Sequence, residues 1–184
     1  QYLSTYAEPE AQLSLPGFQF DSVVTIPALG ESLETLFLSL RSAGKHSNSK
    51  PLYIVVVNNR LDHSETLIEA NRLYLGQCSS FQTLNSFGSP VLWDGSDTLV
   101  VDRHSVPFPQ KQGVGLARKI GCDIALKLIA DKVVTSPWIR CIDGDCEAPL
   151  NYFSISPSSE AVVFLYPFEH ILDWTNSDEA RALQ

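Results

Sequence analysis

The sequence LYIVVV at residues 52–57 is the strongest strand signal in the chain. Six apolar residues in a row leave no polar face for solvent, so the run predicts a parallel strand that other elements cover on both sides. Parallel neighbours are joined by crossover connections, which are usually helices. The residues on either side of this run should therefore alternate between strand and helix patterns.

Such an alternation is present in both directions. Before the run, the β-branched stretch SVVTI at 22–26 stops at Pro27, a pattern typical of a short buried strand. After it, apolar residues recur every four positions from Leu116 to Leu128, which predicts an amphipathic helix. The order predicts an α/β fold: an open, mainly parallel sheet with helices on both faces. The expected helices are 31–43, 62–75 and 113–130, and the expected strands are 22–26, 52–57, 98–101, 138–142 and 161–166.

The chain divides into two parts by composition. Residues 1–20 mix Pro, Glu and Ser with scattered apolar groups and are expected to form an N-terminal arm. Residues 21–184 are expected to form one domain, which is an ordinary size for a single core. The chain contains no methionine and stops within a stretch that reads as the start of a helix, so we expect the domain to be incomplete at its C-terminus.

The overall charge restricts the ligands that the chain can bind. With a formal net charge of −8, it is not expected to bind nucleic acid or an anionic membrane surface. A phosphate-bearing ligand would need local help from a divalent metal, from placed Arg or Lys groups, or from a helix N-terminus. No apolar run approaches the roughly 18 to 20 residues of a membrane span, and no signal segment opens the chain. We therefore expect no membrane span and a cytoplasmic location.

Cysteine and histidine give no metal pattern. The four cysteines form no Cys-x-x-Cys pair, and they are interpreted as free thiols in a reducing compartment, with a disulfide as the alternative. The four histidines have no mutual metal spacing and are expected in loops or at the surface.

Polar residues follow three of the expected strands, where ligands bind in open α/β sheets. Asp143-Gly144-Asp145 is the most informative of these sites. Two carboxylates across a glycine can present oxygens to one hard cation, which would leave positions for water and for a diphosphate. The alternative is an acidic surface turn, in which Asp and Gly are common.

The helix expected from residue 113 is a second possible anchor for an anion. Gly113 and Gly115 allow close approach of a ligand to the backbone, and Lys111, Arg118 and Lys119 cluster nearby. The alternative is that the cations lie on the solvated face of the helix. Neither a Gly-x-Ser-x-Gly elbow nor a Gly-x-x-x-x-Gly-Lys-Ser/Thr loop is present, so a serine hydrolase and a P-loop enzyme are not supported.

Four segments occur in an order and spacing that match one enzyme family. They are VVTIPA at 23–28 followed by Glu31, IVVVNN at 54–59, GLARKIG at 115–121 and IDGD at 142–145. Together they resemble a family 2 glycosyltransferase of GT-A fold, the inverting group that uses nucleotide-diphosphate sugars. The resemblance implies a hexosyltransferase-like enzyme that acts on a sugar-nucleotide donor and an unknown acceptor, which could be a glycan, a lipid or a small molecule.

The resemblance implies a nucleoside site at the first two strand ends. Pro27, Ala28 and Glu31 would lie beside the base and ribose. Asn58 or Asn59 would face the base, where the family usually has Asp. An amide both donates and accepts hydrogen bonds, so contact with the base is retained while the choice of nucleoside stays open.

The resemblance also implies a diphosphate site. Arg118 would lie near the base or the diphosphate, whereas Lys119 stands where the family often has Asn and is given no firm role. Asp145 would ligate Mn²⁺ or Mg²⁺, and Asp143 would contact the ribose or the metal.

The family's general base has no recognisable counterpart, so the catalytic residue is unknown and the C-terminal acceptor part is expected to be lacking. Glu169 and His170 are the only later residues considered to reach the donor sugar, while Asp173, Asp178 and Glu179 match no family segment. A non-catalytic sugar-nucleotide-binding module is therefore the alternative. A haloacid dehalogenase-type phosphatase is disfavoured, because its Asp-x-Asp follows the first strand.

Overall fold

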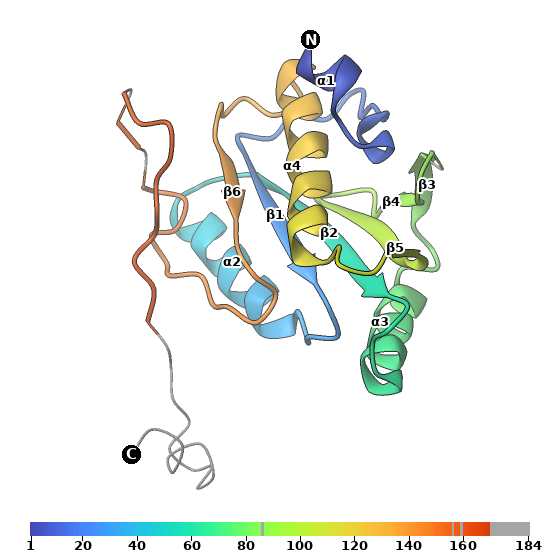
Figure 1. The fold of residues 1–184 in the computed structure, drawn as a ribbon. Helices are drawn as coiled ribbons and strands as arrows, with labels where there is room; N and C mark the ends of the chain where they lie inside the picture. Colours follow the sequence, from blue (N-terminus) through green and yellow to red (C-terminus); the bar gives the residue numbers. More distant parts are fainter. Residues whose placement is uncertain (86, 156, 159, 170–184) are drawn as a thin grey trace, which may run out of the picture. The chain divides into compact units, whose positions relative to one another are not determined.

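The computed structural model describes residues 1–85, 87–155, 157–158 and 160–169. The chain forms two units, Gln1–Ser154 and Ile155–Gln184, and all the helices and strands described below lie in the first. That unit is an α/β fold with a six-stranded sheet (Figure 1). Its helices are α1 (Tyr2–Thr5), the 3-10 turn η1 (Pro9–Ala11), α2 (Glu34–His46), α3 (Glu65–Gln77) and α4 (Val114–Ala130). Its strands are β1 (Ser22–Ala28), β2 (Pro51–Arg60), β3 (Gln82–Asn85), β4 (Val91–Trp93), β5 (Thr98–Phe108) and β6 (Ile139–Cys141).

The sheet is mostly parallel, with the order β3-β4-β5-β2-β1-β6. Strands β5, β2, β1 and β6 run parallel, and β3 and β4 add an antiparallel edge. The run at 52–57 lies within β2, near the centre of the sheet, and all its residues are buried. This confirms the prediction of a mainly parallel sheet built around that run.

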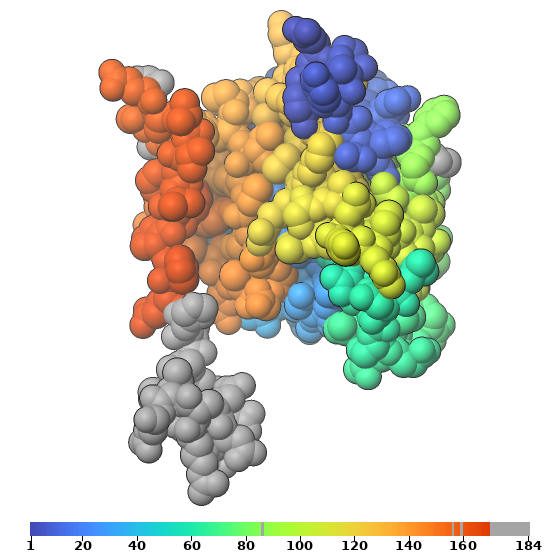
Figure 2. All heavy atoms as spheres, viewed as in Figure 1, coloured from blue at the N-terminus to red at the C-terminus, as the bar shows by residue number. Residues whose placement is uncertain are grey.

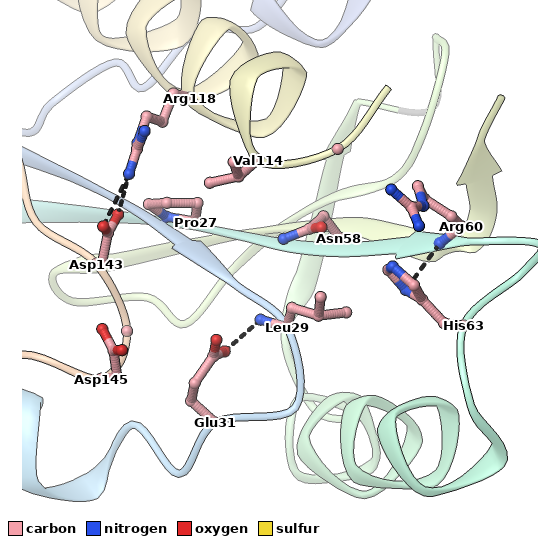
Figure 3. A pocket seen from close by; sticks show the side chains of 12 residues that line it. Pro27, Leu29, Glu31, Asn58, Arg60, His63, Val114, Arg118, Asp143 and Asp145 are labelled. Carbon is pink, nitrogen blue, oxygen red and sulfur yellow. Dashed lines mark hydrogen bonds and ion pairs between the residues drawn. The ribbon is translucent and has the colours of Figure 1, made fainter. Parts of the chain in front are cut away.

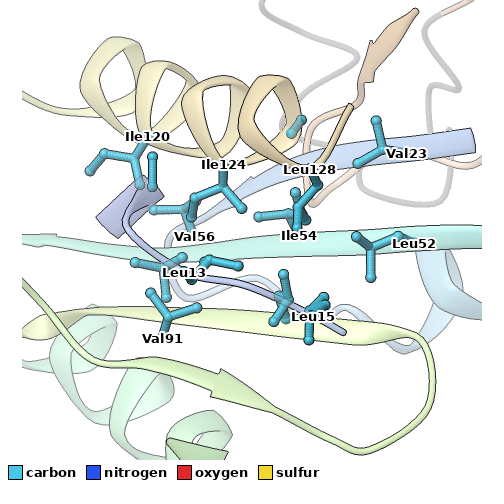
Figure 4. Close-up of a cluster of buried hydrophobic side chains, with 14 of the residues drawn as sticks. Leu13, Leu15, Val23, Leu52, Ile54, Val56, Val91, Ile120, Ile124 and Leu128 are labelled. Atoms are coloured by element: carbon cyan, nitrogen blue, oxygen red, sulfur yellow. The ribbon is translucent and has the colours of Figure 1, made fainter. Parts of the chain in front are cut away.

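Alternate residues of β2 face opposite layers. Ile54 and Val56 belong to the core cluster that contains Ile120 and Ile124 of α4 (Figure 4). On the other face, the ring of Tyr53 packs edge-on against Phe37 of α2, with 5.4 Å between the ring centroids. Helices therefore cover both faces, as predicted, because a strand without a polar side must bury both.

The N-terminal segment is closely packed on the face that α4 covers. Ala11, Leu13, Leu15 and Phe20 are buried in the same core cluster as α4. Figure 2 shows this segment, in blue, packed against α4, in yellow and orange. The residues expected to form an arm thus supply part of the core of the domain.

Gly121 sets how closely α4 approaches β1. A Cβ atom at this position would lie 3.0 Å from Cβ and 3.3 Å from Cγ2 of Thr25. Such separations are shorter than ordinary carbon contacts of about 3.5–4.0 Å. The absence of a side chain therefore lets the helix backbone rest directly on the strand.

Two features differ from the sequence-based expectation. The apolar run at 161–166, expected to be a strand, contains no strand, because such a run does not specify a pairing partner and an unpaired strand has no ladder to stabilise it. The Ser- and Gly-rich region 76–97 contains β3 and β4, whose short antiparallel pairing its composition did not indicate. Within the described part of the chain, no helix is long and apolar enough to cross a membrane.

A candidate ligand pocket at the carboxyl ends of the parallel strands

A pocket of about 380 Å³ opens beside the point where the strand order reverses. After β1 and β2 the chain forms β3, β4 and β5 on the far side of β2, and then returns to place β6 on the other side of β1. In open α/β sheets, ligands bind outside the carboxyl ends of the strands at such a point. The lining residues are Pro27, Leu29, Glu31, Asn58, Arg60, His63, Gly113, Val114, Arg118, Asp143, Gly144 and Asp145 (Figure 3).

Most of the residues predicted from the strand ends and from the start of the helix line the pocket. Six of the eight predicted site residues line it, and Ala28 and Asn59 do not. Lys111, Lys119 and Gly115 are also absent from the lining, whereas Gly113 is present. Of the three cations predicted to cluster near the start of the helix, only Arg118 lines the pocket.

Lys119 has a different set of partners. Its ammonium group donates to the backbone carbonyl of Tyr6 at 2.7 Å and pairs with Glu8 at 2.9 Å and with Asp123 at 2.7 Å. These contacts connect α4 to the N-terminal segment. Lys119 therefore has a structural role in this fold.

Asn58 is a buried amide that joins the ends of the first two strands. Its Nδ2 donates to the carbonyl oxygen of Ala28 at 2.7 Å, so Ala28 takes part through its backbone. The Nδ2 of Asn71, in α3, donates to the backbone carbonyl oxygen of Asn58 at 2.9 Å. The Oδ1 of Asn71 accepts from the backbone N–H of Gly30, also at 2.9 Å. Asn71 thus connects the loop after β1 to the end of β2. Its signal in the sequence is an Asn inside an expected helix, where Asn is unfavourable without a special partner.

Asn59 contacts a histidine and does not line the pocket. Its Oδ1 lies 3.1 Å from Nδ1 of His63, and the same nitrogen accepts from the backbone N–H of Arg60 at 3.2 Å. Burial, followed by the charge of Arg60, lowers the pKa of His63 below its ordinary value. His63 therefore presents a neutral ring to the pocket at neutral pH, and it is a lining residue that the sequence pattern placed in a loop without a role.

Arg60 is a second pocket cation that sequence reasoning missed. It follows the two asparagines directly, and its Nε donates to Oδ1 of Asp62 at 2.9 Å. Together with Arg118, it gives the pocket two guanidinium groups in a chain with a net charge of −8. The signal that could have found it is its place at the carboxyl end of the central strand.

Arg118 and Asp143 form an ion pair within the pocket. The Nη2 atom of Arg118 lies 2.6 Å from Oδ1 and 2.8 Å from Oδ2 of Asp143. The hydrogen bond to Asp143 raises the pKa of Arg118. Both side chains are almost half exposed, so the pair contributes at most about 1 kcal/mol to stability. In Figure 3 the Arg118 guanidinium points toward Asp143, so the pair holds it at that side of the pocket.

The turn at Gly144 places the two aspartates against the loop after β1. A Cβ at Gly144 would lie 3.0 Å from Cδ2 of Leu33 and 3.5 Å from the carbonyl oxygen of Pro27. In the same loop, the backbone N–H of Leu29 donates to the Glu31 carboxylate. A side chain at position 144 would press on Leu33, and Asp143, Gly144 and Asp145 together form part of the pocket lining.

The pocket carboxylates include Asp143 and Asp145, the two residues predicted to ligate a metal. Within the described residues, no group of three His, Cys, Asp or Glu side chains could hold a metal ion by itself. Asp145 lines the pocket and accepts a long hydrogen bond of 3.7 Å from the Cys146 thiol. Mg²⁺ is commonly held by one or two carboxylates together with substrate phosphates, and Asp145 with Asp143 fits that limited protein contribution.

Comparisons with known proteins give no further assignment. Neither the models of protein families, nor the curated protein sequences, nor the solved structures contain a match to the chain.

Proposed function

We propose that the pocket binds the nucleoside diphosphate of a sugar nucleotide, and that the chain is the donor domain of a metal-dependent, inverting glycosyltransferase of GT-A type. One observation carries the proposal. Asn58, Arg118, Asp143 and Asp145, which are up to 87 residues apart in the chain, line a single pocket at the point of strand-order reversal. Pro27 and Glu31 belong to the same lining.

The charges in the pocket suit a diphosphate with a divalent cation. Arg60 and Arg118 supply guanidinium groups, which bind phosphate oxygens through directed hydrogen bonds. The first turn of α4 at Val114 adds backbone N–H groups and the positive end of the helix dipole. Asp145 would hold Mn²⁺ or Mg²⁺, assisted by Asp143, and the bound metal would neutralise negative charge on the leaving diphosphate.

The nucleoside would lie between the ends of β1 and β2. Pro27 and Leu29 offer apolar surface beside Asn58, and Glu31 can accept a hydrogen bond from a ribose hydroxyl. Asn59 would act indirectly, because its side chain lies against His63 at the pocket wall. The choice between uridine and guanosine would then depend on Asn58, Arg60 and His63.

In the proposed reaction, an acceptor hydroxyl attacks the anomeric carbon of the donor sugar from the face opposite the nucleotide. A new carbon–oxygen bond forms as the bond to the diphosphate breaks, and the electron pair leaves with the diphosphate. Arg118, which lines the pocket, would stabilise the charge that develops on this leaving group. The base that takes the hydroxyl proton is unassigned: Glu169 belongs to the second unit, and His170, Asp173, Asp178 and Glu179 lie outside the described residues.

A non-catalytic sugar-nucleotide-binding module is the second candidate. Three carboxylates line the pocket, and each already has a partner or a proposed ligand. Glu31 accepts from the Leu29 backbone, Asp143 pairs with Arg118, and Asp145 would hold the metal. None of the three is left to activate an acceptor. A module of this kind would bind the donor without transferring its sugar.

Calorimetric titration with UDP and with GDP, each with and without Mn²⁺, tests the proposal. We expect one of the two nucleotides to bind in the presence of Mn²⁺ and to bind at least about tenfold more weakly without it. Absence of binding by both nucleotides, or equal affinity with and without metal, would falsify the proposed site. Release of UDP or GDP from sugar nucleotides, assayed over a panel of hydroxyl acceptors, then separates the enzyme from the module.

Replacing Asp145 by Asn should remove the metal-dependent part of nucleotide binding. The amide keeps the shape of the side chain and loses its charge. Loss of a partner that only supports a metal ligand typically weakens metal affinity by about 10- to 100-fold, so loss of the ligand itself should weaken it at least as much. Asp131→Asn, at the end of α4 where Asp131 pairs with Lys127, is the matched control and should leave the affinity unchanged. An Asp145→Asn protein with the wild-type response to Mn²⁺ contradicts the assignment.

A further inference from the structure

Two cysteine thiols lie side by side next to the pocket. The Sγ atoms of Cys122, in α4, and Cys141, at the end of β6, are 3.8 Å apart. Cys141 is exposed and Cys122 is partly exposed, so small reagents can reach the pair. The other two cysteines differ: Cys78 is buried, and Cys146 contacts Asp145.

The packing of the fold holds these sulfur atoms together. Gly121 precedes Cys122 and brings α4 against Thr25 of β1. Thr25 is the direct strand partner of Cys141, and its hydroxyl donates to the Cys141 sulfur at 3.1 Å. The thiol pair therefore results from the close approach of α4 to the sheet.

The same two elements carry the ion pair of the pocket. Arg118 lies one helical turn before Cys122, and Asp143 follows Cys141 by two residues. Arg118 and Asp143 thus link α4 to the segment after β6 at 2.6 Å, and the thiols adjoin that link. A disulfide between Cys122 and Cys141 would therefore restrict the distance between Arg118 and Asp143.

We propose that Cys122 and Cys141 are a site of oxidative modification, at which a peroxide converts the thiol pair into a disulfide that ties α4 to β6. Hydrogen peroxide is the oxidant: the two S–H bonds and the O–O bond break, the S–S bond forms, and two water molecules are released. The two sulfurs give up two electrons and the peroxide takes them. A dithiol reductant reverses the reaction by thiol–disulfide exchange.

The disulfide would restrict the pocket. A disulfide holds its sulfurs about 2.05 Å apart, against 3.8 Å between the two thiols, so it would fix α4 and β6 at a close spacing. Arg118 would then stay on Asp143 and be less available to a diphosphate. This consequence rests on the proposed function, and the expected change is an affinity for UDP or GDP at least about threefold weaker in the oxidised protein.

The disulfide itself is tested without any nucleotide. The reduced full chain, which has four free cysteines, is treated with hydrogen peroxide, and its free thiols are counted by alkylation and mass spectrometry. We expect two free thiols, a mass lower by about 2 Da from the loss of two hydrogens, and a cross-link between the peptides that carry Cys122 and Cys141. Cys146→Ser should keep the cross-link, whereas Cys122→Ser and Cys141→Ser should each lose it.

The outcomes separate this proposal from the function. Four thiols that remain reduced, oxidation to sulfinic acid without a cross-link, or a cross-link that includes Cys146 would overturn the modification site. A correct cross-link with unchanged affinity for a nucleotide that the reduced protein binds would overturn the effect on the pocket. If neither form binds UDP or GDP, the proposed function fails and the mapped disulfide stands.

Discussion

Replacing Glu10 by alanine should lower the free energy of unfolding by about 3–5 kcal/mol, the usual cost of removing one member of a buried ion pair. The Glu10 side chain is fully buried, and its Oε1 accepts from Arg103 at 2.8 Å and from the Ser89 hydroxyl at 2.7 Å. Arg103 is 13% exposed and stacks over the ring of Phe108, so its charge cannot move into solvent without disturbing the core. Urea unfolding followed by circular dichroism measures the effect.

The control for Glu10 is Glu69→Ala. Glu69 pairs with Arg72 at 2.6 Å, but both side chains are about half exposed, so the loss should stay within roughly 0.5 kcal/mol. The double variant Glu10→Met with Arg103→Met removes both charges and should recover most of the stability lost in Glu10→Ala. Equal effects of Glu10→Ala and Glu69→Ala would show that the N-terminal segment is not packed into the domain as described.

Gly121→Val should lower the free energy of unfolding by about 1–3 kcal/mol, the typical cost of overpacking a core. The added Cβ would lie 3.0 Å from Thr25, and the methyl groups beyond it have no room between α4 and β1. The helix would have to move away from the strand. Thermal unfolding should therefore show a lower Tm.

Gly115→Val is the matched control on the same helix. No atom lies within 4 Å of the position that its Cβ would take, so the substitution meets open space. Helix propensity favours valine over glycine slightly, and the change in stability should be within about 0.5 kcal/mol of zero. Equal destabilisation by both variants would show that close contact at Gly121 is not the cause.

The parallel core of the fold was predictable because its strands are long and apolar. The run at 52–57 has no polar face, and the structure places it in β2 with a helical layer on each side. The helix expected over 113–130 is confirmed as Val114–Ala130, since its apolar residues repeat over about three turns. Patterns of this kind are local, so a single sequence displays them fully.

Elements that depend on a partner were not predictable in this way. The strands β3 and β4 contain only four and three residues, and they exist because β4 pairs with the edge of β5. The run at 161–166 has the apolar composition of a strand, yet no strand forms there. Composition measures how well a segment would suit a sheet, and it contains no information on whether an edge is available.

The candidate site was also predictable only in part. The sequence placed Pro27, Asn58, Asp143 and Asp145 at strand ends, and parallel strands bring such ends to one edge of the sheet. The roles of their neighbours were decided by side-chain contacts. Asn59 turns to His63, and Lys119 turns to the N-terminal segment, although each stands beside a residue that lines the pocket.

By itself, the sequence determined the α/β class, the central strand and the set of polar strand ends, because hydrophobic periodicity and strand termini are properties of short segments. Only the tertiary structure decided that Arg60 and His63 join the pocket, that Asn71 supports it, and that Cys122 meets Cys141. These contacts join residues from different elements. They follow from the order of the strands and from the closeness of α4 to β1 at Gly121, neither of which a single segment specifies.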